Sequence, residues 1–300
     1  MKLSFSILII LLFISTQAFG IGIKTPSGIN GLADLVYTNG WALIIGVKDY
    51  TPSSFQRPYA ESDVDAVSEV LTSKYGFNKE HIITLKNENA TKKNIMASIE
   101  SLAEPKKVSI EDCLLIYFCG QGVTFTNEKG DYGFLVPYNT DFDLSKEYSY
   151  DDYKANCMSV YSLQIALRFV LARHILIVVD GCSGGVLIRS IRKTGSEISD
   201  PILRASACKG FLVLIAGQKG EKPIDDHDTK SSVFTYNFIK ALDEYLADEN
   251  KDGLITGSEL ASYLGEMLSK ATDGKQKTKF IKAGDGDFLF APQLEKPKEK

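Results

Sequence analysis

The chain has 300 residues, of which 44% are hydrophobic and 24% are charged, and its formal net charge is −4. This length and apolar content are enough for one large folded domain and exclude a disordered chain. The mildly acidic balance gives no reason to expect nucleic acid or an anionic membrane as a partner.

The first twenty residues are expected to lie outside the fold. Lys2 precedes an apolar run at residues 7–14, which is too short for a comfortable membrane span, and the small residues Ala18 and Gly20 follow. This pattern is typical of a secretory signal peptide at residues 1–20, with an uncleaved N-terminal anchor as the alternative. We therefore expect a secreted or extracytoplasmic protein that has no membrane contact after signal cleavage.

Short apolar runs alternate with segments in which apolar residues recur at helical spacing. The runs predict strands at residues 41–47, 82–85, 113–119, 175–179, 211–216 and 287–290;. Helices are predicted at 60–75 with Ser62 as the cap, after the cap Thr91, and at 159–170, 231–247 and 258–272;. Residues 139–153 are interpreted as a surface loop and 293–300 as a disordered tail;.

This alternation predicts the fold class. It indicates an α/β protein with a doubly wound, mostly parallel sheet of about six strands and flanking helices. No internal repeat or linker suggests a second domain, so one domain is expected over residues 38–292.

Two predicted strands end in small and polar residues. The strand at 175–179 is followed by Asp180, Gly181 and Cys182, and the strand at 113–119 is followed by Gly120, Gln121 and Gly122. Ligand sites of open α/β sheets lie at the carboxyl ends of their strands. From position alone, a buried structural cysteine is an equal alternative for Cys182.

Several motifs, taken together in their order, resemble the caspase and metacaspase family of cysteine peptidases. The motifs are W-A-L-I-I-G-V-K-D-Y, S-D-V-D-A, L-L-I-Y-F-C-G-Q-G, G-D-Y-G-F-L-V-P, D-G-C, S-V-F-T and G-D-G-D-F-L-F. The resemblance implies a caspase-like fold with Cys182 as the nucleophile. It also implies that the N–H groups of Gly122 and Cys182 stabilise the oxyanion.

The same resemblance implies a pocket for a basic P1 side chain, the one that precedes the scissile bond. Asp63 and Asp180 would hold that side chain, and Cys119 would line the pocket. An ordinary helix-capping role is the alternative for Asp63. The expected partner is therefore a peptide or protein with Lys or Arg residues. Cys119 and Cys182 end neighbouring strands, so a disulfide between them stays open in an oxidising compartment.

Gln121 stands where the family pattern F-S-G-H-G has its catalytic histidine. A glutamine amide cannot exchange a proton near neutral pH, so the expected protein is a pseudopeptidase or a strongly impaired peptidase. The alternative is an active endopeptidase with a non-standard base. For that role His174 lies at the far end of its strand, His81 is interpreted as a surface residue, and His227 is the one credible substitute.

Residues 248–259 fit the EF-hand pattern D-x-[DN]-x-[DN]-G-x₅-E, with predicted helices on both sides;. Ca²⁺ prefers oxygen ligands, and the bidentate acid at the twelfth position distinguishes such a loop from an ordinary acidic turn. One calcium ion is expected, with the ligands Asp248, Asn250, Asp252, Leu254, Thr256 and Glu259. A calcium-responsive interaction module is a further alternative function. The sequence gives no oligomeric state.

Overall fold

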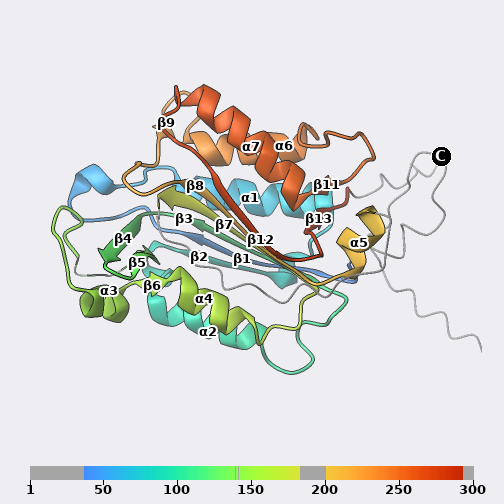
Figure 1. The fold of residues 1–300 in the computed structure, drawn as a ribbon, viewed down its shortest axis with the longest axis horizontal. Coiled ribbons are helices and arrows are strands. Elements are labelled where there is room, and N and C mark those ends of the chain that lie inside the picture. The colour runs from blue at the N-terminus through green and yellow to red at the C-terminus, as the bar shows by residue number, and fades with distance from the viewer. Residues whose placement is uncertain (1–36, 139, 141, 183–200, 293–300) are drawn as a thin grey trace, which may run out of the picture.

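The computed structural model describes residues 37–138, 140, 142–182 and 201–292. The predicted signal peptide and C-terminal tail lie outside these residues. A six-stranded sheet in the order β12-β8-β7-β3-β1-β2 forms the centre (Figure 1). Five strands run parallel, and β12 is antiparallel to β8. Their bounds are β1 Gly40–Gly46, β2 Ile82–Lys86, β3 Cys113–Cys119, β7 His174–Cys182, β8 Gly210–Gly217 and β12 Lys279–Gly284. The predicted α/β class with a mostly parallel sheet is confirmed.

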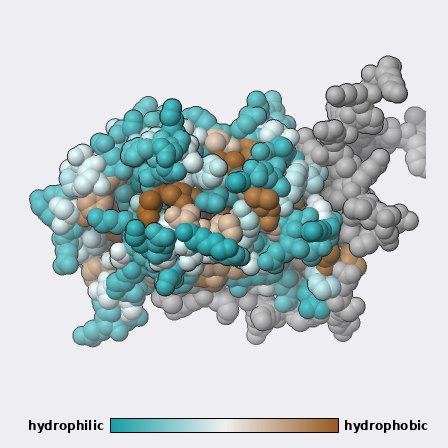
Figure 2. Space-filling model, turned by 90° about the horizontal axis from the view of Figure 1, so that it is seen from above, coloured by the Kyte–Doolittle hydropathy of each residue, from teal (hydrophilic) through white to brown (hydrophobic). Residues whose placement is uncertain are grey.

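Helices cover both faces of the sheet, as Figure 1 shows. The helices α1 (Ala60–Tyr75), α6 (Val233–Asp243) and α7 (Gly257–Ala271) pack on one face, and α2 (Lys92–Leu102) and α4 (Val160–Leu167) pack on the other. The central strands β1 and β3 are buried along their whole length because helices shield both of their faces;. The outer surface of the α1, α6 and α7 layer is mainly hydrophilic, with small hydrophobic groups between polar ones (Figure 2). Within the described residues, no helix combines the length and apolarity that a membrane span requires.

One edge strand differs from the prediction. Residues 287–290 were expected in the main sheet, but β13 (Leu289–Phe290) pairs with β11 (Ile255–Thr256) in a separate small sheet. The edge position belongs to β12, which carries Lys279 and Lys282 and is half-buried over most of its length. An edge strand of this kind has no continuous apolar run, so its sequence gives a weaker signal than a central strand.

The two predicted helix caps had different outcomes. The Thr91 hydroxyl accepts a hydrogen bond from the Asn94 N–H and caps α2, as predicted. The prediction for Ser62 is wrong, because α1 begins at Ala60 and the Ser62 hydroxyl donates to the carbonyl of Tyr59 at 2.9 Å. Ser62 therefore lies inside the first turn of α1, where its hydroxyl binds a neighbouring carbonyl. It does not accept a hydrogen bond from the free N–H groups at the start of the helix;.

A second, three-stranded sheet lies beyond the carboxyl ends of the parallel strands (Figure 1). It consists of β4 (Gly122–Asn127), β5 (Gly130–Leu135) and β6 (Met158–Ser159), with α3 (Tyr150–Asn156) beside it. The interpretation of residues 139–153 as a surface loop is wrong in part, because Phe142 and Tyr153 are buried and their rings contact each other. Aromatic packing against the second sheet draws this polar-looking segment inward. The remaining short elements are α5 (Pro201–Ala207), β9 (Asp225–Asp226) and β10 (Ser231–Ser232).

Candidate active site

The ends of β3 and β7 lie side by side. Cys119 and Asp180 are register partners in the parallel pair, and the Gly120 N–H donates to the Asp180 carbonyl at 3.1 Å. Cys182 ends β7 opposite Gly217 of β8, and a bulge between Val179 and Cys182 gives β7 one extra residue. Bulges of this kind occur next to active sites, where they change the direction in which a strand end projects. The candidate nucleophile, Cys182, is therefore the last residue of β7, at the carboxyl edge of the sheet.

Gly122 presents its N–H toward the same strand end. The Val136 N–H donates to the Gln121 carbonyl, so Gly122 and Leu135 form the following pair of the antiparallel ladder, which lacks mutual hydrogen bonds;. The Gly122 N–H consequently points away from β5. A Cβ atom added to Gly181 would lie 3.7 Å from the Gly122 nitrogen and 2.8 Å from the Gly120 carbonyl oxygen. Glycine at 181 is therefore required by the close approach of β7 to the Gly120 carbonyl, and this packing also brings β7 near the Gly122 N–H;.

The Gln121 side chain is buried and committed to a backbone partner. Its amide nitrogen donates to the Phe55 carbonyl at 2.7 Å, and its own N–H donates to the Tyr50 hydroxyl at 2.9 Å. Tyr50 in turn donates to the Val136 carbonyl. The residue thus fastens the end of β3 to the segment that follows β1. It offers no group that can take up a proton near neutral pH.

Asp63, Cys119 and Asp180 converge in the interior. One ligand atom from each lies within 4.8 Å of the others, and all three residues are buried. The Cys119 sulfur lies 3.5 Å from a carboxylate oxygen of Asp180 and 3.8 Å from one of Asp63. Cys119 is a free thiol in this arrangement, not half of a disulfide. We call these three residues the acidic cluster.

Hydroxyl groups at the start of α6 hold both carboxylates. Ser231 donates to Asp63 at 2.5 Å, and the Ser232 N–H donates to the other oxygen of Asp63 at 3.1 Å. The hydroxyls of Ser232 and Thr235 both donate to Asp180. Ser232 is also the N-cap of α6, so the S-V-F-T motif begins a helix and orients the cluster at once;.

Arg57 lies against the carboxyl end of β7 and binds Asp180 of the acidic cluster. It is 1% exposed, and its guanidinium binds Asp180 through both carboxylate oxygens at 3.2 Å. The same side chain donates to the carbonyls of Gly120 and Asp180, at 2.9 and 3.1 Å, and to Asp225 on β9 at 3.2 Å. All the N–H groups of this buried guanidinium therefore have hydrogen-bond partners, and its charge is paired with carboxylates.

The electrostatics of this region follow from burial. Burial and the nearby Asp180 charge raise the pKa of Asp63 to about 7. Burial opposes the charge on Arg57, but the carboxylates of Asp180 and Asp225 outweigh it and hold the pKa of the guanidinium well above its ordinary value. Burial and Asp180 also raise the pKa of the Cys119 thiol well above its usual range. Cys119 is therefore a buried thiol in its neutral form.

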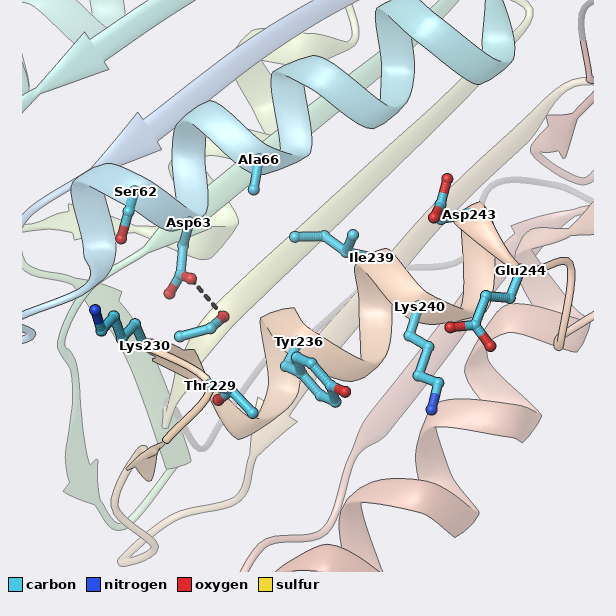
Figure 3. A pocket seen from close by; sticks show the side chains of 11 residues that line it. Ser62, Asp63, Ala66, Thr229, Lys230, Tyr236, Ile239, Lys240, Asp243 and Glu244 are labelled. Carbon is cyan, nitrogen blue, oxygen red and sulfur yellow. Dashed lines mark hydrogen bonds between the residues drawn. The ribbon is translucent and has the colours of Figure 1, made fainter. Parts of the chain in front are cut away.

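The outer side of Asp63 borders a groove of about 350 Å³ between α1 and α6 (Figure 3). Ser62, Asp63 and Ala66 contribute from α1, and Tyr236 and Ile239 from α6. Asp63 turns toward Ser231 at the inner end of this groove, as the dashed bond in Figure 3 shows. Asp63 and Ser231 both line this groove.

The three histidines occupy different environments. His174 is completely buried at the start of β7, where burial lowers its pKa to about 3. His81 is half-buried and stacks on Trp41 with ring centroids 4.0 Å apart, so the interpretation as a plain surface residue is incomplete. His227 contacts the Tyr59 hydroxyl at 2.5 Å on the loop between β9 and β10. Of the three, His227 lies nearest in sequence to a residue that Arg57 binds, Asp225.

The predicted calcium loop joins α6 to α7. Asp248 accepts hydrogen bonds from the N–H groups of Asp252 and Gly253, and Gly253 has a φ of +86°, which suits a sharp turn;. The Glu259 carboxylate accepts from the N–H and hydroxyl of Thr256 in a capping box. Among the described residues, the acids of this loop do not gather as tightly as the acidic cluster does. Their oxygen donors nevertheless suit the chemistry of Ca²⁺.

Comparisons with known proteins agree with this architecture. A family model described as the caspase domain matches residues 39–282. The chain belongs to the caspase-domain family. The chain therefore carries a caspase-like cysteine peptidase fold over most of its length.

Two solved structures share this caspase-domain fold. Protein GSU0716 from Geobacter sulfurreducens is 14% identical, with a TM-score of 0.53, over 82% of this chain and 94% of its own. Caspase-1 from Spodoptera frugiperda is 17% identical, with a TM-score of 0.52, over 90% of this chain and 96% of its own. A search of the curated proteins found no match.

Sequence reasoning missed Arg57 and Asp225, which complete the charged network. Both lie in irregular segments, where nothing in the spacing of residues indicates burial. The dipeptide formed by Arg57 and Pro58 marks an extended or turn conformation and carries no signal of a partner 168 positions away;. The sequence offered one indication of such a partner: two carboxylates predicted to converge, those of Asp63 and Asp180, require a nearby cation or bound protons.

Proposed function

We propose that this caspase-domain protein is a pseudopeptidase or a strongly impaired cysteine peptidase that binds peptides at the carboxyl edge of its sheet. The observation that carries the proposal is the Gln121 side chain, which donates to the Phe55 carbonyl at the strand end where the family resemblance places a histidine. A glutamine in this position can orient a chain, but it cannot take a proton from a thiol or give one to a leaving amine.

The energetic consequence is large. A thiol without an imidazole partner has a pKa of about 8.5, so only a few per cent of such a thiol is thiolate at neutral pH. Positioned acid–base groups contribute about 10²–10⁴-fold, which corresponds to about 3–5 kcal/mol of activation free energy. The backbone donor at Gly122 and the strand geometry remain, so the cleft keeps what peptide binding needs while losing proton transfer.

The acidic cluster suggests the class of side chain that the cleft recognises. Two buried carboxylates, Asp63 and Asp180, lie beside the end of β7. Carboxylates in a desolvated pocket favour guanidinium or ammonium partners, and the planar fork of arginine matches them best. We therefore propose that peptides with Lys or Arg at P1 are the ligands for which this pocket chemistry is suited.

Cleavage of a peptide mixture tests the proposal. The mixture contains acidic, basic and neutral P1 residues, so the result does not depend on the specificity of the pocket. We expect wild type to match Cys182→Ala, and Gln121→His to cleave at least about 10²-fold faster than wild type. Wild-type turnover at about 1 s⁻¹ or faster, lost in Cys182→Ala, would contradict a pseudopeptidase.

That last outcome would favour the second candidate, an active endopeptidase with a non-standard base. His227 is the residue to examine, because its loop continues from Asp225, which binds Arg57 beside the strand ends. Replacement of His227 by Gln would then abolish the cleavage while leaving the fold intact. If His227→Gln cleaved as fast as wild type, a different group would have to serve as the base.

We propose further that residues 248–259 bind one calcium ion. Asp248, Asn250, Asp252 and Glu259 would supply side-chain oxygens, Thr256 a direct or water-bridged contact, and Leu254 its carbonyl. The specific support is electrostatic: burial first, and then the charges of Asp252 and Asp248, raise the pKa of Glu259. A divalent cation would relieve this repulsion and stabilise the connection between α6 and α7.

Titration calorimetry with CaCl₂ tests the calcium site. Wild type and Glu249→Gln are expected to bind one equivalent, because Glu249 is exposed and has no place in the ligand pattern;. Glu259→Gln is expected to lose at least about tenfold in affinity and the calcium-dependent rise in melting temperature. If Glu259→Gln and Glu249→Gln bind alike, the assigned twelfth ligand is wrong. Calcium binding with no peptide binding would favour a calcium-responsive interaction module.

A further inference from the structure

The acidic cluster already contains the kind of group that it is suited to bind. The Arg57 guanidinium contacts both oxygens of Asp180 and both oxygens of Asp225, each at 3.2–3.3 Å. Its remaining donor group binds the carbonyls of Gly120 and Asp180. These contacts come from three strand ends, so the side chain sits in a complete cradle for a planar cation.

The segment that carries Arg57 is fastened on several sides. The Arg57 N–H donates to the Lys48 carbonyl at 2.9 Å, which closes the segment 48–57 on itself. The Lys48 N–H donates to the Asn87 side chain at 2.9 Å. The Phe55 carbonyl, two residues before Arg57, receives the Gln121 amide. Gln121, which stands where the histidine is expected, therefore helps to hold segment 48–57 in place.

Groups of the chain itself already bind both carboxylate oxygens of Asp180. Arg57 lies against Asp180 and Asp225, and the hydroxyls of Ser231, Ser232 and Thr235 take up further acceptor positions on Asp63 and Asp180. Arg57 and Asp180 are each 1% exposed. A basic side chain arriving from a peptide would have to displace Arg57 before it could reach Asp180.

We propose that Arg57 is an internal ligand that occupies the acidic cluster and excludes the basic side chains of peptides from it. The proposal rests on the proposed function, because it identifies what fills the pocket assigned there to Lys or Arg. In the resting protein, segment 48–57 keeps that pocket closed. Removal of the Arg57 side chain creates an unoccupied guanidinium site at the carboxyl ends of β3 and β7.

Thermal unfolding with ethylguanidine as the probe tests this proposal. Ethylamine at the same concentration is the control for a cation without the planar fork, and Arg168→Ala is the control variant, because Arg168 is exposed. We expect Arg57→Ala to unfold at a lower temperature than wild type. Ethylguanidine should then raise its melting temperature saturably, by at least about 3 °C, and ethylamine should raise it less.

Wild type and Arg168→Ala should show no saturable rise with either probe. A rise in wild type as large as in Arg57→Ala would show that the cluster is open while Arg57 is present, and would overturn the proposal. A folded Arg57→Ala that ignores ethylguanidine would overturn it as well. Neither outcome involves peptide cleavage, so a failure of this proposal can be distinguished from a failure of the argument from Gln121.

Footprinting of the wild-type protein decides the matter if Arg57→Ala does not fold. Phenylglyoxal modifies accessible guanidinium groups, and mass spectrometry gives the rate at each arginine. Modification of Arg57 is expected to be at least about tenfold slower than that of Arg168, and to equal it after denaturation. Equal rates in the native protein would show that Arg57 leaves the cluster freely and does not close it.

Discussion

At the scale of single residues, Asp63 makes one contribution to the way in which the stability of this protein depends on pH. Its pKa rises from 3.8 in the unfolded reference to about 7 in the folded protein. Folding therefore takes up a proton between these values, and the associated stabilisation is complete below pH 4. It declines as the pH rises toward 7 and is absent above that.

Asp63→Asn is expected to remove this pH dependence. A shift from 3.8 to about 7 corresponds to about 4 kcal/mol, of which about 3 kcal/mol falls between pH 5 and pH 8;. The free energy of unfolding at pH 5 minus that at pH 8, measured with urea, should therefore be more positive for wild type than for the variant by about that amount. His174, whose pKa burial lowers to about 3, contributes a difference of the opposite sign in both proteins. Asp65→Asn is the matched control, because Asp65 lies on the same helix with its side chain 67% exposed. Should Asp63→Asn keep the full wild-type difference, the titration belongs to another group.

The family resemblance implied that Asp63, Cys119 and Asp180 share one pocket, and the strand and helix patterns agree with it, whereas neither gave Arg57. Cys119 and Asp180 end buried apolar strands, and parallel strands bring their carboxyl ends together;. Asp63 lies in the first turn of a helix whose apolar spacing fixes the face it presents to the sheet;. The position of Arg57 depends on the path of an irregular segment, which no periodic pattern encodes.

At the scale of elements, the cap of α2 is a local contribution to stability. Removal of the hydroxyl in Thr91→Ala leaves the Asn94 N–H without its side-chain acceptor and should cost about 1 kcal/mol of unfolding free energy;. Ser73→Ala is the comparison, since the exposed Ser73 hydroxyl only bonds back to the Glu69 carbonyl within α1;. Equal urea midpoints for Thr91→Ala and wild type would show that the cap contributes nothing.

The elements that the sequence predicts well are those with continuous or periodic apolar residues. The central strands, α1 and α2 are of this kind, and buried residues such as Ile95, Ile99 and Leu102 mark the inner face of α2. The β4–β5 hairpin and β12 were not predicted, because their strands are partly exposed and their sequences lack a regular alternation of apolar and polar residues. For such elements the neighbouring strand, and not the local pattern, decides the conformation.

At the scale of the whole molecule, Tyr37 connects the beginning of the described chain to its end. Its buried hydroxyl lies 2.6 Å from Nδ1 of His174 and accepts a hydrogen bond from the Leu289 N–H at 2.9 Å. Nε2 of His174 lies 2.8 Å from the Cys208 carbonyl, so that nitrogen carries the proton and Tyr37 donates to Nδ1;.

Tyr37→Phe is expected to destabilise the protein by about 1–3 kcal/mol, because it leaves two buried groups without partners. Tyr161→Phe removes a hydroxyl from a side chain that is 41% exposed and should have little effect. Unfolding free energies of both variants, measured under the same conditions, provide the check. A loss for Tyr37→Phe no larger than for Tyr161→Phe would mean that water or a rearranged neighbour replaces the hydroxyl.

The ion pair between Arg57 and Asp225 also indicates the order in which parts of the chain fold. The two residues are 168 positions apart, and Arg57 must in addition meet Asp180 of β7. Trp41, by contrast, is buried once β1 pairs with β3 and its indole reaches Asp112. Contacts between distant segments form late because loop closure is costly. During refolding, Trp41 fluorescence should therefore reach its native value before Arg57 becomes protected from chemical modification.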